Sequence, residues 1–162
     1  MQQQLFLARI FAKCLDADDY EAARTTLAAD CRCDTGKAIL TGPEAIIESY
    51  RNSSVWARST FDDVRFESRI EQDLSSPYRI CVFYSDILRK AGDSHVHQCR
   101  QFLTIDEAST KITAIEHLEV DAEAARLEEF FERIGVRRNR SGGGAAKRAA
   151  TICDRTTRGQ AR

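Results

Sequence analysis

The hydrophobic period of this sequence changes near residue 63, and that change constrains the fold more than any other feature. Upstream, apolar side chains recur at helical spacing, whereas downstream they alternate with charged ones. This alternation is typical of a β-strand with one buried and one solvated face. The apolar side holds Val64, Phe66, Ser68 and Ile70, and the charged side holds Arg65, Glu67, Arg69 and Glu71.

Three further strands are predicted after this one, with short polar turns between them. They span residues 79–90, 95–106 and 111–120. The first of the three is almost continuously apolar, so we expect it near the centre of its sheet. Connections this short join antiparallel neighbours, and the second half of the chain is therefore predicted to be an antiparallel meander.

The first half of the chain is predicted to be mainly helical. One apolar face of a first helix is formed by Leu7, Ile10, Phe11, Cys14 and Leu15. A short strand at residues 31–35 follows a second helix, and residues 38–40 can pair back with it. A third helix then runs past Tyr50.

Capping patterns predict where these helices begin. Asp18 with Glu21, and Thr41 with Glu44, have the spacing of capping boxes for the second and third helices. Asp121 is expected to cap a last helix, which would end near Gly135.

The predicted domain spans residues 1–136, and the composition changes after it. Residues 137–162 hold eight Lys and Arg against one acidic residue, Asp154, and offer little apolar surface to bury. We expect a disordered basic tail that is dispensable for folding. Residues 1–136 hold 16 Lys and Arg against 24 Asp and Glu. This acidic balance argues against nucleic-acid binding by the domain, and leaves only weak contact through the tail.

Six cysteines without an export signal indicate a reducing compartment. The apolar stretch at residues 5–15 is interrupted by Arg9 and Lys13, so it does not read as a signal peptide. No stretch is long and apolar enough to span a membrane. We therefore predict free thiols, most of them buried, in a cytoplasmic protein.

Several segments resemble the nuclear transport factor 2-like superfamily, whose members include SnoaL-like polyketide cyclases, ketosteroid isomerases and limonene epoxide hydrolases. The resemblance lies in LDADDYEAA at 15–23, LAADC at 27–31, LTGPEAIIESY at 40–50 and KITAIEH at 111–117. It covers about residues 5–136 and implies an α+β fold, in which a cone-shaped, curved antiparallel sheet and its helices enclose a pocket. It does not indicate a reaction, because the superfamily contains both enzymes and binding proteins.

The resemblance also implies which side chains line the pocket, since alternate residues of each strand face the concave side. The expected lining is Cys33 and Thr35; Tyr84, Asp86 and Leu88; His97, Cys99, Gln101 and Leu103; and Ile115, His117 and Glu119. A shift of one residue would invert every assignment. Arg79, Arg100 and Glu116 would lie on the convex face, where members of the superfamily often pack as homodimers, and a homodimer is expected here.

The catalytic residues of ketosteroid isomerases are not matched. Where those enzymes have a carboxylate base and a Tyr donor, this sequence has Thr35 and Phe11. The neighbouring Asp34 could act as the base only in a different strand register. That isomerisation is therefore disfavoured.

Limonene epoxide hydrolases use an Arg and an Asp on a middle strand with a second Asp on the last strand. The matching positions are Tyr84, Asp86 and His117, so the resemblance keeps one Asp alone. A carboxylate and an imidazole facing each other across a pocket are nevertheless suited to general acid–base chemistry. The candidate catalytic residues are thus Asp86, His117 and Tyr84, and the candidate substrate-binding residues are His97, Cys99, Gln101, Thr35 and Cys33. Asp86 and His117 could also be a satisfied buried pair.

A metal site is disfavoured by the sequence. His95, His97 and Cys99 share one strand face, and Cys33 or His117 could complete a ligand set. Alternate strand positions lie far apart for a common ion, however, and no Cys-x-x-Cys motif is present, so we expect no metal and no cofactor. Two functions remain open for a pocket that holds a small organic ligand. One is a cofactor-free acid–base enzyme, such as a cyclase, isomerase, dehydratase or hydrolase of a partly apolar substrate, and the other is a noncatalytic ligand-binding or protein-interaction module.

Overall fold

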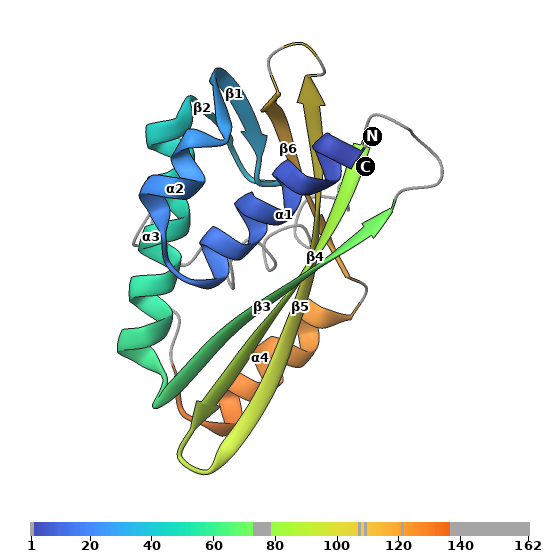
Figure 1. Ribbon diagram of the computed structural model, residues 1–162. Coiled ribbons are helices and arrows are strands. Elements are labelled where there is room, and N and C mark those ends of the chain that lie inside the picture. Colours follow the sequence, from blue (N-terminus) through green and yellow to red (C-terminus); the bar gives the residue numbers. More distant parts are fainter. Residues whose placement is uncertain (1, 73–78, 107, 109, 121, 137–162) are drawn as a thin grey trace, which may run out of the picture.

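Four helices and one six-stranded sheet make up the computed structural model, which describes residues 2–72, 79–106, 108, 110–120 and 122–136 (Figure 1). The expected tail at 137–162 and the expected helix cap Asp121 lie outside the described residues. The elements in chain order are α1 Gln2–Asp16, α2 Tyr20–Thr25, β1 Leu27–Asp34, β2 Ile39–Thr41, α3 Pro43–Thr60, β3 Asp63–Gln72, β4 Arg79–Lys90, β5 Asp93–Asp106, β6 Lys111–Glu119 and α4 Glu123–Arg133.

The strands are ordered β2-β1-β6-β5-β4-β3, and the predicted α+β class is confirmed. Strands β3 to β6 form the antiparallel meander that the alternating pattern predicts. The expectation of a wholly antiparallel sheet is wrong at one place, because β1 pairs with β6 in parallel. This pairing joins the N-terminal strand to the end of the meander and places β4 and β5 in the interior of the sheet.

One face of the sheet, here called the inner face, is covered by the helices and divides into two apolar clusters. The first cluster packs Phe11 and Leu15 of α1 against Tyr84 and Leu103. The second packs Phe130 of α4 and its neighbours against the far ends of β3 and β4. In Figure 1, α1 crosses in front of the upper part of the sheet and α4 lies behind the lower part. The long strands are therefore twisted, so that the same face of the sheet points toward α1 at one end and toward α4 at the other.

The starts of α2 and α3 differ from the predicted capping boxes. Asp19, not Asp18, caps α2 by accepting a hydrogen bond from the Ala22 amide at 3.1 Å. Gly42, not Thr41, precedes α3, and no side chain caps that helix. Gly42 has φ 87°, a conformation that glycine adopts without steric cost, and its amide donates to the Cys31 carbonyl.

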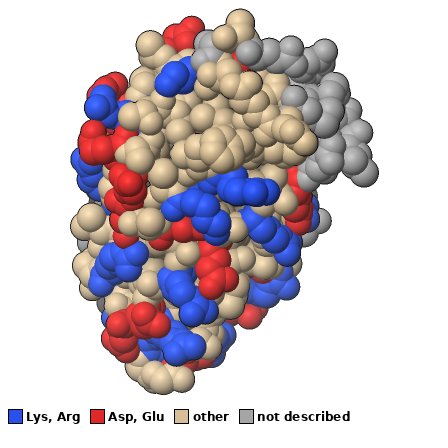
Figure 2. Space-filling view, viewed as in Figure 1, with Lys and Arg blue, Asp and Glu red and all other residues tan. Residues whose placement is uncertain are grey.

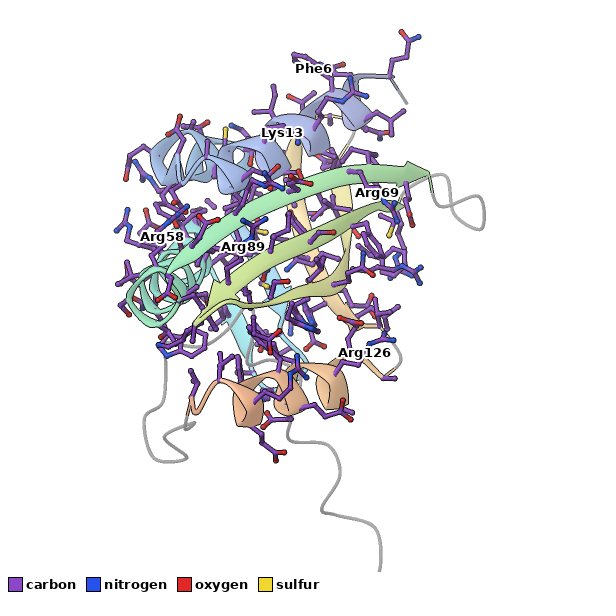
Figure 3. The ribbon with its side chains drawn as sticks, turned by 90° about the horizontal axis from the view of Figure 1, so that it is seen from below. Phe6, Lys13, Arg58, Arg69, Arg89 and Arg126 are labelled. Carbon is purple, nitrogen blue, oxygen red and sulfur yellow. The ribbon has the colours of Figure 1, made fainter. Side chains whose placement is uncertain are left out.

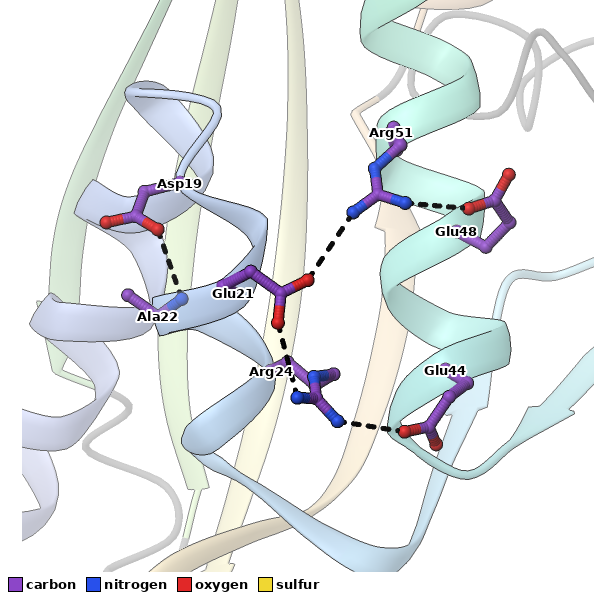
Figure 4. A network of polar contacts seen from close by, with 7 residues as sticks. All are labelled: Asp19, Glu21, Ala22, Arg24, Glu44, Glu48 and Arg51. Carbon is purple, nitrogen blue, oxygen red and sulfur yellow. Dashed lines mark hydrogen bonds and ion pairs between the residues drawn. The ribbon is translucent and has the colours of Figure 1, made fainter.

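Exposed ion pairs join α2 to α3 (Figure 4). Arg24 of α2 lies 3.1 Å from Glu44 of α3, and Glu21 of α2 lies 3.7 Å from Arg51 of α3. Each such exposed pair contributes about 1 kcal/mol or less. The helices are therefore held mainly by their buried faces, and the ion pairs only bias how the two helices align.

The opposite, outer face of the sheet carries arginines stacked on aromatic rings. Phe83 is only 5% exposed because guanidinium groups of Arg69 and Arg100 lie 4.1 and 5.4 Å from its ring centre. Arg79 lies over Phe102 and forms a 2.6 Å ion pair with Glu116. The strand register thus confirms that Arg79, Arg100 and Glu116 lie on the outer face.

Positive and negative side chains are interspersed on the face shown in Figure 2, below an area without charged groups. None of the described helices has the length and apolar character that crossing a membrane requires. The five cysteines within the described ranges, Cys14, Cys31, Cys33, Cys81 and Cys99, are free thiols, and four of them are buried.

Candidate functional site

Buried polar side chains occupy the inner face where the two apolar clusters meet. On β4, Asp86 lies between Tyr84 of the first cluster and Leu88 of the second. Asp86 is 3% exposed, and His97 on β5 is fully buried. Polar groups at such positions are costly to bury unless they find partners, so the boundary between the clusters is the candidate site.

Asp86 and His97 are directly opposite each other in the antiparallel β4–β5 ladder. Opposite residues on one face have Cβ atoms about 4.5 to 5.5 Å apart, which brings a carboxylate and an imidazole into one local environment. Tyr84, two residues before Asp86 on β4, lies opposite Cys99 on β5. The sequence analysis predicts that these four residues share the inner face, and all four are buried.

The predicted contact between Asp86 and His117 is wrong. His117 on β6 pairs with Gln101 on β5, four residues along β5 from His97, which faces Asp86. Two strand spacings and a four-residue offset place the two Cα atoms about 16 Å apart, beyond direct or one-water reach. Parity places both residues on one face but does not fix their offset along the strands.

His117 is instead a separate, half-buried imidazole. Burial lowers its pKa from 6.5 to about 4, although the charge of Asp34 on β1 acts in the opposite direction. Its Nε2 atom has no hydrogen-bond partner among the described residues. His117 is therefore neutral near pH 7.

A helix residue that the sequence did not single out for the site contributes a hydrogen bond to the inner face. The Tyr50 hydroxyl of α3 donates to Oε1 of Gln101 at 2.8 Å, in a buried contact. The Tyr50 ring also packs edge-on against Phe11 at 6.0 Å. Tyr50 lies on the apolar face of its helix, so the sequence pattern alone classifies it as core.

Two predicted binding residues lie at the β1 end of the inner face. Cys33 is buried and pairs in register with Ile115 of β6. The Thr35 hydroxyl donates to the Ala38 carbonyl at 3.0 Å and accepts from the Ala38 amide at 3.1 Å. Thr35 therefore stabilises the turn between β1 and β2, and its oxygen is already engaged.

A second imidazole and a carboxylate extend the site toward α4. His95, His97 and Glu123 each place a ligand-type atom within 4.8 Å of the others. Glu123 is the first residue of α4, and its Oε2 lies 3.7 Å from Nδ1 of His97 and 4.0 Å from Nε2 of His95. Burial lowers the pKa of His95, and the Glu123 carboxylate opposes that change.

The Glu123 carboxylate also interacts with two residues other than the two histidines. Oε2 accepts a hydrogen bond from the backbone N–H of Gln98 at 3.0 Å, and Oε1 forms an ion pair with Arg126, which is labelled in Figure 3. The sequence offered only one signal for Glu123, an acidic residue in the first turn of the last predicted helix. That signal points to helix stability rather than to a site.

A separate basic groove of about 130 Å³ runs between α1 and β3. Its lining includes Arg9, Lys13 and Arg69, the last two of which are labelled in Figure 3. Pockets for drug-sized ligands usually exceed about 300 Å³, so this groove is too small for such a molecule. It borders the inner face, because Ser68 in its wall lies opposite Tyr84.

Comparison with known proteins gives a likeness in structure alone. No family model matches the sequence, and no curated protein matches it. A putative polyketide cyclase from Xanthomonas campestris pv. campestris superposes with a TM-score of 0.58 at 16% identity, over 82% of this chain and 97% of its own. TerC, crystallised with polyporic acid, gives 0.58 at 14% identity, over 80% and 98%.

A third structure is Rv0760c from Mycobacterium tuberculosis in complex with estradiol-17beta-hemisuccinate. It superposes with a TM-score of 0.54 at 17% identity, over 75% of this chain and 96% of its own. At these identities the comparisons establish the fold and leave the activity open.

Proposed function

Because this chain has the nuclear transport factor 2-like fold, we propose that its inner sheet face binds a small, partly apolar organic molecule and performs cofactor-free acid–base chemistry on it. The observation that carries the proposal is the buried carboxylate of Asp86 directly opposite the buried imidazole of His97, where the two apolar clusters meet. Apolar walls with a few convergent polar groups are typical of small-molecule sites.

The structural neighbours support the first half of this proposal. Polyporic acid and estradiol-17beta-hemisuccinate, named with two of them, are small organic molecules. A ligand of that kind would meet apolar side chains from both clusters on this chain's inner face. The Tyr50–Gln101 hydrogen bond would provide a fixed polar edge for orientation.

Asp86 is the residue best placed for proton transfer. We assign it the role of accepting a proton from an activated carbon of the ligand, while the electron pair of that C–H bond moves into an adjacent carbonyl. The Tyr84 hydroxyl lies on the same strand face and could donate to the developing oxyanion. Cyclisation, isomerisation, dehydration and water addition all begin or end with such a transfer. His117 has no part in this assignment, because it lies too far along the sheet.

A noncatalytic binding protein is the second candidate, and the engaged hydroxyl of Thr35 and the packed apolar clusters are compatible with it. In that case the inner face would hold a ligand unchanged. The two candidates differ in whether Asp86 alters the ligand or only contacts it.

We also propose that the chain forms a homodimer through the outer face. Val96 and Leu118 are 48% and 43% exposed; Leu118 lies opposite Arg100, and Val96 lies opposite Ile87. A partner sheet would cover these apolar side chains.

Native mass spectrometry of the full chain purified from cells tests ligand binding. A Cys99→Phe variant places a phenyl ring on the inner face, whereas Val96→Phe on the same strand places one on the outer face. We expect a bound small molecule on the wild type and on Val96→Phe, and its loss from Cys99→Phe. Equal retention by the two variants would contradict the proposed location. Thermal melting of both variants controls for misfolding.

A further inference from the structure

We propose that His95, His97 and Glu123 form a binding site for one divalent transition-metal ion, of the kind represented by zinc or cobalt(II). This inference goes beyond the proposed ligand-binding function, which requires no metal. It rests on how β5 and the start of α4 place three ligand-type side chains together.

The distances in the cluster suit coordination better than hydrogen bonding. Oε2 of Glu123 lies 3.7 Å from Nδ1 of His97 and 4.0 Å from Nε2 of His95, both beyond hydrogen-bond length. Zinc–ligand bonds of about 2.1 Å in a tetrahedral site place two ligand atoms about 3.4 Å apart. Small side-chain rotations would therefore close these three atoms around one ion.

The ligand atoms are screened from water and already oriented. The side chains of His97, Glu123 and His95 are 0%, 4% and 12% exposed. The His95 ring stacks on Phe130 with ring centres 5.3 Å apart. Nε2 of His95, the atom nearest to Glu123, is buried and makes no hydrogen bond with any described residue. A buried ring nitrogen in this position is what an ion would satisfy.

Two groups outside the cluster contact the Glu123 carboxylate, in the way that hydrogen-bonding residues around a metal site orient its ligands. The backbone N–H of Gln98 donates to Oε2 at 3.0 Å, and Arg126 forms an ion pair with Oε1. A carboxylate oxygen has a second lone pair, so Oε2 can accept the amide and still face the imidazoles. Such outer hydrogen bonds fix ligand orientation in known metal centres.

Two imidazoles and one carboxylate define the class of ion. This set suits zinc, iron(II) and cobalt(II), and it leaves at least one coordination position open. Calcium and magnesium are disfavoured because they require mostly oxygen ligands. The sequence argument against a metal held that alternate strand positions lie too far apart for a common ion. In the structure the ligand atoms of His95 and His97 lie within 4.8 Å of each other, Glu123 of α4 supplies a third ligand atom, and Cys99 is not a member of the cluster.

Cobalt(II) titration of the full chain, followed by visible absorption and by calorimetry, tests the proposal. The wild type should bind one cobalt ion and develop d–d bands without the intense near-ultraviolet band of cobalt–thiolate coordination. His95→Gln and Glu123→Gln should each weaken binding more than about 100-fold, since losing an outer-shell partner alone costs roughly 10- to 100-fold. His117→Gln, which changes a half-buried imidazole elsewhere on the sheet, should bind cobalt like the wild type.

Three results would overturn the proposal. They are no binding at millimolar cobalt, a thiolate band in the wild-type spectrum, and unchanged affinity in His95→Gln. Because Glu123→Gln also disturbs the pair with Arg126, each variant is first compared with the wild type by circular dichroism. His95→Gln then decides the matter if Glu123→Gln does not fold.

Discussion

Asp86 on β4 lies directly opposite His97 on β5, and the two side chains are 3% and 0% exposed. They occupy the boundary between an apolar cluster under α1 and another under α4. An ionised carboxylate is costly to bury there unless it is paired, and a well-packed apolar pair would avoid that cost. This relationship is the basis of the proposed chemistry and of the first prediction.

Asp86→Asn should reduce turnover of the natural substrate by about 100-fold or more, because the amide cannot accept the proton. The side chain keeps its shape, so the melting temperature should change far less than it does after truncation of a core residue. The exposed outer-face variant Glu67→Gln is the matched control and should leave turnover unchanged. If Asp86→Asn retained full turnover, the carboxylate would have no role in the reaction.

His117 should make folding stability depend on pH below neutrality. Its folded pKa is about 4 against an ordinary value of 6.5, so the unfolded chain takes up a proton first as the pH falls. The contribution is fully present above about pH 6.5 and is lost between about pH 6.5 and 4. The lost part is roughly 2 to 3 kcal/mol.

Urea unfolding of the wild type and His117→Gln across that range measures this effect. The difference in unfolding free energy between the two proteins should shift by most of that amount between pH 7 and pH 4. Parallel pH profiles for the two proteins would mean that His117 titrates normally in the folded state.

Asp18 should matter more for stability than its neighbour Asp19. The Asp18 carboxylate accepts hydrogen bonds from Tyr20 and Ser54 and pairs with Arg58, so it ties the α1–α2 turn to α3. Asp18→Ala should cost about 2 kcal/mol, and Asp19→Ala, which removes a helix cap, about 1 kcal/mol. Chemical denaturation compares the two, and the reverse order would contradict this assignment.

The outer face should mediate dimerisation. Light scattering of the wild type at micromolar concentration should give twice the mass of the chain. Val96→Glu should produce monomers, because it buries a charge in the proposed interface. Val55→Glu, at a more exposed apolar position on α3, should remain dimeric. A monomeric wild type would refute the dimer.

Sequence patterns predicted the elements well because hydrophobic period depends on local geometry. The alternation from Val64 to Ile70 and the apolar run after Arg79 correspond to β3 and β4. The same parity correctly placed Asp86 and His97 on the inner face. Two helix starts were displaced because long-range contacts decided them: Asp18 bonds to α3, and the Gly42 amide bonds to Cys31.

The composition of the site was harder to predict, because it depends on strand offset and on helix docking. Asp86 and His117 have the correct parity, but the β4–β5–β6 register separates them by two strands and four residues. Glu123 approaches His97 only because α4 packs across β5, which no local pattern encodes. Tyr50 similarly reaches Gln101 from another element.

The most direct test of the central claim is amide chemical-shift mapping by NMR while the full chain is titrated with ring-containing acids, including estradiol-17beta-hemisuccinate and polyporic acid. The fold alone does not require binding on the inner face, so the location of the shifts is informative. We predict that compounds which bind will shift the amides of Asp86, Cys99 and Gln101 together with Tyr50. Shifts confined to the outer face or to the α1–β3 groove, or no shifts at these amides with any compound, would contradict the claim.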